Sequence, residues 1–104
     1  MELKEGVSVR QLTVQGLLII IAGSQILDLV APGTRCVVTS GDDGKHGFKS
    51  KHYRGDAVDF RTRNLTREQK EQFEHMMKKS LGKDFDVILE DTHLHVEYDP
   101  KGQR

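Results

Sequence analysis

The stretch DAVDFRT, residues 56–62, alternates polar and apolar side chains along most of its length. Successive side chains of a β-strand point to opposite faces, so Val58 and Phe60 would share one face, which we expect to join the core. Asp59 and Arg61 would lie on the opposite face. A strand over residues 56–62 would therefore present Asp59 on a surface that is available for chemistry.

A second alternating stretch, HLHVEYD, lies at residues 93–99. The residues on its polar face are His93, His95 and Glu97. It follows the strand-like stretch DFDVILE, residues 84–90, after two residues that suit a tight hairpin. We expect an antiparallel sheet to bring this polar face close to Asp59. Polar groups from two distant parts of the sequence would then converge.

Two longer segments have the patterns of helices. The first, residues 13–29, has Thr13 as a candidate N-cap and is followed by a Pro-Gly pair that stops it. We expect it to be a helix of the core. The apolar residues that mark it are Leu17, Leu18, Ile21, Ile26 and Leu29. The second, residues 65–82, has a capping-box pattern at Thr66 and a terminating glycine, and is expected to be amphipathic.

The order of these elements indicates the fold class. At 104 residues the chain has room for a single domain, residues 1–104. With residues 34–41 as a further strand, the order is α-β-β-α-β-β, which predicts an α+β domain. We expect two helices to pack on one face of a small, largely antiparallel sheet. Residues 41–55 contain four glycines and little apolar periodicity, so they are expected to form an exposed loop that carries function.

Composition excludes several classes of partner. Lys+Arg and Asp+Glu both number 16, so no overall positive field exists to attract nucleic acid. The apolar segment 17–30 contains Asp28 and is too short to cross a bilayer, so we expect no membrane association. The N-terminus lacks the pattern of a secretory signal, which predicts synthesis in the cytoplasm. Cys36 is expected to be a small buried hydrophobe, and the protein is expected to be a monomer.

Four of the five histidines belong to two clusters, one in the glycine-rich loop and one on the last strand. An H-x-H pair on a strand is, by itself, more often two surface histidines than a metal site. Here the pair is coupled to His52 and Asp59, and two imidazoles with one carboxylate leave a fourth position open, as a catalytic zinc requires. Because His52 and Asp59 are seven residues apart, they cannot share one face of a strand. His52 is therefore expected in the loop, folding back over the metal.

These residues also form a recognisable motif. Ser50, His52, Gly55, Ala57 and Asp59 spell S-x-H-x-x-G-x-A-x-D, and an H-x-H follows. The set resembles the signature of zinc D-Ala-D-Ala peptidases and phage L-Ala-D-Glu endolysins. In spacing, HYRGDAVD is closer still to the N-terminal signalling domain of Hedgehog proteins, which shares that fold. The resemblance implies a Hedgehog/DD-peptidase-like fold and a Zn²⁺ cofactor.

The resemblance also implies roles for particular residues. The zinc ligands it implies are His52, Asp59 and His95, and the residues it places in the catalytic pocket are His93 and His46. Family peptidases carry an acid at the position of Thr92, and the carboxylates just before it are those of Glu90 and Asp91. For the general base we favour Glu90, with Asp91 second. The family's arginine in an S-G-Y-R-S context is missing. The candidates to replace it in substrate binding are Lys45 and Arg54.

Together these features predict a zinc-dependent metallopeptidase that cleaves peptidoglycan stem peptides as a carboxypeptidase or endolysin. The resemblance favours a bacteriophage or prophage protein, which would reach the cell wall after release or as part of a virion. The two departures from the family pattern leave two alternatives open. One is a non-catalytic zinc-binding module of Hedgehog-like fold with a structural or partner-binding role, and the other is an α+β interaction domain without metal.

Overall fold

The computed structural model describes residues 1–7, 9, 12–40 and 55–100. The predicted site residues Lys45, His46, His52 and Arg54 lie outside these ranges. The elements are β1 (Glu2–Leu3), α1 (Val14–Val30), β2 (Val37–Ser40), β3 (Ala57–Arg61), α2 (Arg67–Leu81), β4 (Phe85–Leu89) and β5 (His93–Tyr98). The predicted α+β class and the order of its elements are confirmed, with the short strand β1 as an addition.

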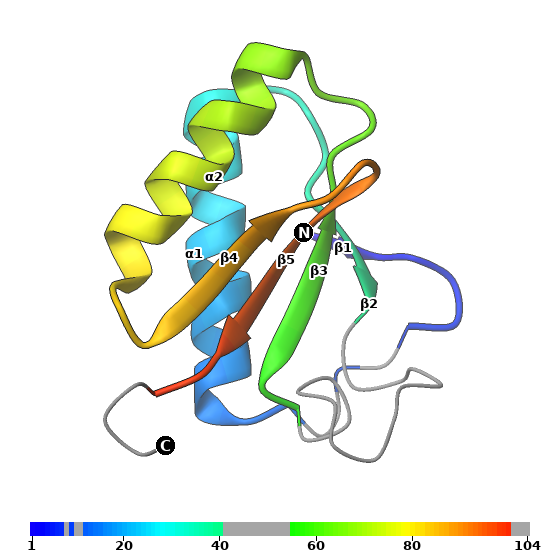
Figure 1. The fold of residues 1–104 in the computed structure, drawn as a ribbon. Coiled ribbons are helices and arrows are strands. Elements are labelled where there is room, and N and C mark those ends of the chain that lie inside the picture. Colours follow the sequence, from blue (N-terminus) through cyan, green and yellow to red (C-terminus); the bar gives the residue numbers. More distant parts are fainter. Residues whose placement is uncertain (8, 10–11, 41–54, 101–104) are drawn as a thin grey trace.

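The described strands form one sheet in the order β1-β2-β3-β5-β4 (Figure 1). Strands β1 and β2 run parallel, and all other neighbours are antiparallel. Strand β3 occupies the middle of the sheet, with β5 on one side and β2 on the other. The predicted hairpin is confirmed as β4 and β5, and its turn is closed by the Glu90 N–H, which donates to the carbonyl of His93 at 2.9 Å.

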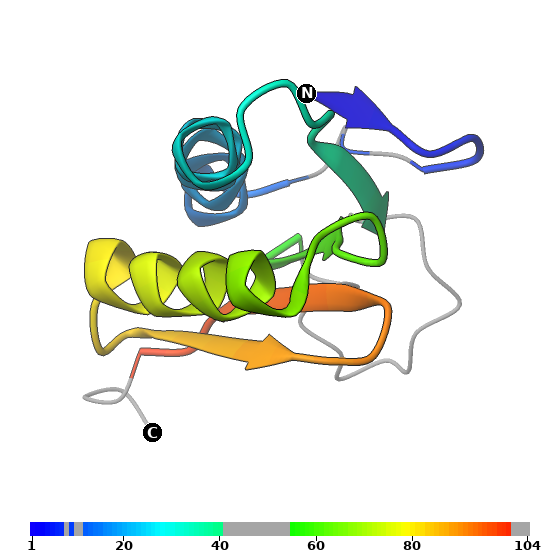
Figure 2. The ribbon, with the colours of Figure 1, turned by 90° about the horizontal axis from the view of Figure 1, so that it is seen from above.

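Both helices cover the same face of the sheet, as predicted (Figure 2). Phe60 of β3 is fully buried on this face and meets the ring of Phe73 from α2 edge-on, with ring centroids 5.8 Å apart. Other side chains of the core are Ile19, Leu27, Val38, Val58, Met77, Leu94 and Val96. The face away from the helices is left for polar groups.

Sequence-encoded caps fix both helix starts. The hydroxyl of Thr13 accepts a hydrogen bond from the N–H of Gly16. The backbone N–H of Thr13 donates to the carbonyl of Gly55 at 3.0 Å. Thr66 and Gln69 form the predicted capping box at the start of α2. The bonds of Thr13 tie the start of α1 to the chain just before β3.

Of the apolar residues that marked this helix in the sequence, only Ile26 is buried. Ile19, Ile20, Gly23, Ile26 and Leu27 are the residues that face the core, while Leu17, Leu18, Ile21 and Leu29 are about half or more exposed. The helix is apolar on nearly every side, so its sequence does not distinguish the buried face. Small residues decide the packing instead, because Gly23 lets the backbone of α1 approach the ring of Phe60.

Replacing Gly23 with alanine is expected to lower the free energy of unfolding by about 1–3 kcal/mol. A Cβ at this position would collide with the ring of Phe60, which is itself fully buried. The loss would be measured by urea unfolding, with Gln25→Ala as the control, because Gln25 is exposed on the same helix. Equal midpoints for the two variants would contradict this packing.

Two further expectations concern Cys36 and the membrane. Cys36 is buried, as predicted, and burial raises the pKa of its thiol. Among the described residues, no helix has the length and apolar character needed to span a bilayer.

Candidate functional site

The polar face of the sheet brings Asp59 close to the histidines of the last strand, as the alternation in the sequence predicted. Strands β3 and β5 pair so that Asp59 stands directly opposite His95, and Arg61 opposite His93. Their neighbours Phe60 and Leu94 point to the core and are fully buried. Because side chains alternate along both strands, the polar groups share the face that the helices leave open.

His95 lies between two carboxylates. Its Nδ1 is 2.7 Å from Oδ1 of Asp59, and its Nε2 is 2.8 Å from Oε1 of Glu97. The three side chains are only 18%, 13% and 21% exposed. With a proton on each ring nitrogen, the imidazole donates to both acids and forms a largely shielded charged group.

This environment changes the titration of His95. Burial disfavours the charged imidazole, but the hydrogen bonds to Asp59 and Glu97 and their negative charges outweigh that effect. Together they raise the pKa of His95 from 6.5 to about 9. In the metal-free protein, His95 is therefore charged at neutral pH.

The metal-free protein is expected to lose stability as the pH rises through about 9. The pKa of His95 is 6.5 in the unfolded chain and about 9 in the folded one, so the stabilisation is complete below pH 6.5 and disappears above 9. This difference in pKa corresponds to about 3 kcal/mol in the free energy of unfolding. Urea unfolding with a chelator, from about pH 6 to about pH 10, would measure it. His95→Gln should flatten the profile, and an unchanged profile in that variant would exclude His95 as the cause.

His93 lies at the edge of the same group. Its Nε2 is 3.9 Å from Oδ2 of Asp59, and its Nδ1 is 3.1 Å from the hydroxyl of Thr92. At 32% its side chain is more exposed than that of His95. His93 is therefore the more solvent-exposed of the two histidines on this polar face.

The donor set at Asp59 and His95 is compatible with zinc. Ligating histidines commonly donate their second ring N–H to a carboxylate, and Glu97 is placed to accept that bond from Nε2 of His95. The opposite nitrogen, Nδ1, faces Asp59. Two such donors lie about 3.3 Å apart around a tetrahedral zinc. Nδ1 of His95 and Oδ1 of Asp59 are 2.7 Å apart, so a small side-chain shift would admit the ion. The third predicted ligand, His52, lies outside the described residues.

The predicted carboxylate bases lie elsewhere on the surface. Asp59 and His93 line a depression of about 240 Å³. Glu90 and Asp91 line a separate depression with Arg67 and Lys70. The structure thus brings Asp59, His93 and His95 together and leaves the two acids of the hairpin turn outside this group.

Glu97 is the residue whose role the sequence left unassigned. Alternation along β5 already predicts that it shares a face with His95, two residues earlier. The two-residue spacing could therefore have predicted the hydrogen bond, because side chains that are neighbours on one face of a strand can bond to each other. Its carboxylate holds the imidazole ring in place.

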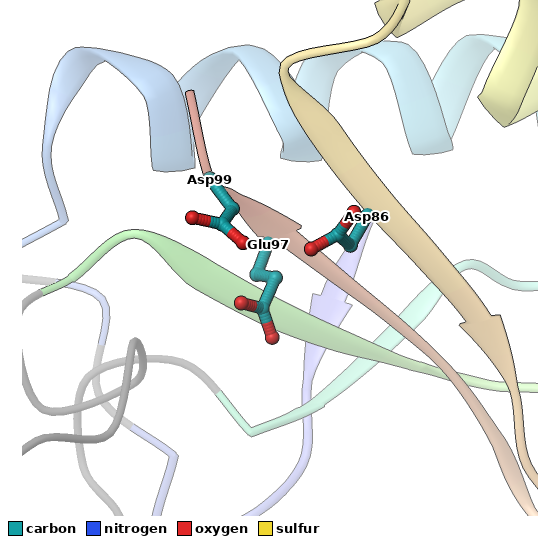
Figure 3. A group of neighbouring side chains, drawn as sticks. All are labelled: Asp86, Glu97 and Asp99. Carbon is teal, nitrogen blue, oxygen red and sulfur yellow. The ribbon is translucent and has the colours of Figure 1, made fainter. Parts of the chain in front are cut away.

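A second group of carboxylates lies beside this site (Figure 3). Asp86, Glu97 and Asp99 each offer an oxygen within 4.8 Å of the others. A set made only of carboxylates suits calcium or magnesium better than zinc, and acidic groups commonly gather on a surface without an ion. This cluster therefore adds no support for zinc, and we assign no ion to it.

Two comparisons with known proteins find no match for this chain. No family model matches it, and no curated protein matches its sequence. The resemblance to zinc peptidases and Hedgehog domains therefore depends on the motif residues themselves.

Proposed function

We propose that this protein is a zinc-dependent metallopeptidase. The observation that carries the proposal is the pairing of Asp59 with His95, two of the three residues that the sequence motif implies as ligands. His52 would be the third. The substrate class we propose is the stem peptide of peptidoglycan, and the setting is a bacteriophage or prophage that releases the enzyme to the cell wall.

The described residues suggest a division of roles. Asp59 and His95 would hold the metal, while Glu97 would keep the His95 ring oriented and its Nε2 protonated. A zinc ion held there would act as a Lewis acid on the scissile carbonyl and would make a water molecule more acidic. The face of the sheet positions these groups rigidly, because each belongs to a paired strand.

Proton transfer is the step for which the geometry and the sequence favour different residues. The sequence favoured Glu90, whereas the geometry supports His93, which shares a depression with Asp59. His93 is also close to the proposed metal position and partly open to solvent. We therefore propose that His93 transfers the proton during hydrolysis. Variants at Glu90 and Asp91 provide the comparison.

The proposal predicts about one zinc per chain in protein purified without chelator. Metal analysis would be combined with a dye-release assay on purified cell walls, before and after chelation. Release that stops on chelation and returns with zinc would support the peptidase. Protein with no zinc at all would refute it and leave the α+β interaction domain without metal.

One observation favours a second candidate, a non-catalytic zinc-binding module. Thr92 occupies the position of the family acid, and its neighbours Glu90 and Asp91 lie in another depression. A protein without a base would keep the metal but lose about a hundredfold to ten-thousandfold in rate. In this case, zinc would be bound stoichiometrically, no cell wall would be cleaved, and chelation would lower the melting temperature.

A further inference from the structure

Three of the seven described residues that line the depression next to the proposed metal position have cationic side chains. It has a volume of about 240 Å³ and crosses the polar face from Lys4, just after β1, to His93 on β5. Thr39 of β2 and Asp59 of β3 line its middle. Arg61 and Arg63 add two guanidinium groups beside them. Three cations thus gather around one carboxylate that the sheet already pairs with His95.

These cations have no anionic partner in the part of the chain that the structure describes. Among the described residues, Arg35 pairs with Glu2, Lys78 pairs with Glu74, and His95 lies between Asp59 and Glu97. None of these ion pairs includes Lys4, Arg61 or Arg63. Cations that line a depression without partners raise the local concentration of anions.

We propose that this depression is a carboxylate-binding subsite, in which Arg61 binds the free α-carboxylate of the substrate residue that follows the scissile bond. The inference rests on the proposed function and narrows its substrate class. The guanidinium of Arg61 can take both carboxylate oxygens in a bidentate contact. Lys4 and Arg63, which also line the depression, supply further positive charge.

Distances along the strand support this assignment. Arg61 is two residues from Asp59 on the same face of β3, so their backbones are about 6.6 Å apart. The α-carboxylate of the residue after a scissile bond lies about 3.5 Å beyond the scissile carbon. A substrate whose scissile carbonyl lies at the metal would therefore carry this carboxylate into the space between Asp59 and Arg61.

His93 strengthens the assignment. It stands directly opposite Arg61 in the register of β3 and β5, and both line the depression. A carboxylate held by Arg61 would bring the leaving amine of the same residue close to His93. The subsite would thus orient the group that must receive a proton.

Equilibrium binding of small peptides tests the subsite without turnover. The probes are the stereoisomers of N-acetyl-alanyl-alanine, each as free acid and as C-terminal amide, measured by NMR titration with protein as purified and after chelation. We expect at least one free acid to bind about tenfold to hundredfold tighter than its amide. A matched probe, N-acetyl-alanyl-glutamic acid α-amide, carries only a side-chain carboxylate and is expected to bind like the amides.

Variants assign the preference to Arg61. Arg61→Gln should abolish the preference for the free acid over the amide, and Arg61→Lys should restore part of it. Arg67→Gln should keep this preference, because Arg67 lines the other depression. If Arg61→Gln fails to fold by circular dichroism, Arg63→Gln combined with Lys4→Gln should weaken the preference instead.

Several outcomes would overturn the subsite. These are equal binding of acid and amide, tight binding of the side-chain probe, no binding of any probe, or a preference that persists in Arg61→Gln but vanishes on chelation. A protein that keeps the preference but holds no zinc and cleaves nothing would refute the proposed function and leave the subsite standing.

Discussion

Replacing His95 with alanine is expected to weaken zinc binding by about a hundredfold to a thousandfold and to abolish hydrolysis. Zinc sites with four protein ligands contribute about 10–16 kcal/mol, so a single ligand accounts for about 2.5–4 kcal/mol. Of the two proposed ligands that the structure describes, His95 has the better fixed orientation, because both of its ring nitrogens have carboxylate partners. Competition with a chromophoric chelator would measure the zinc affinity directly.

The chain offers a matched control for this experiment. His75 lies exposed on α2, so His75→Ala removes an imidazole without touching the polar face of the sheet. It should keep the zinc affinity of the parent protein. His95→Gln would show whether a polar side chain of similar size protects the fold while the metal is still lost. If His93→Ala empties the site and His95→Ala does not, the ligand would be the other histidine of the pair.

Replacing His93 with alanine is expected to leave zinc in place and to reduce the rate of hydrolysis by about a hundredfold to ten-thousandfold. Loss of a positioned proton-transfer group typically has an effect of this size. His93 is not among the proposed ligands, and its nearest contact in the site, at 3.9 Å from Asp59, is longer than a hydrogen bond. Metal content and steady-state rate would be measured on the same preparation, so that loss of zinc is not mistaken for loss of proton transfer.

Two conservative variants test the residue that the sequence favoured. Glu90→Gln and Asp91→Asn each remove one negative charge from the hairpin turn with little change of volume. Because both side chains line the depression with Arg67 and Lys70, we expect them to keep most of the rate. A drop of two to four decades in Glu90→Gln alone would restore Glu90 as the base. It would also show that the hairpin turn moves toward the metal during the reaction.

Much of the fold could be predicted because its signals are local. Alternation placed Asp59 and His95 on polar faces and Phe60 and Leu94 in the core, and the structure confirms each placement. The caps at Thr13 and Thr66 were equally local, since a side-chain oxygen reaches an N–H only three residues away. Strand β1 was missed because two residues are too short to show a period.

The sequence by itself determined which residues of each strand share a face, because the pleat repeats every two residues. It did not determine the register of strands that are more than thirty residues apart, because that register depends on contacts between distant parts of the chain. Only the tertiary structure decided that Asp59 lies opposite His95 and that Glu97 holds the second ring nitrogen. The same holds for α1, because a helix that is apolar on nearly every side takes its buried face from contacts such as that of Gly23 with the ring of Phe60.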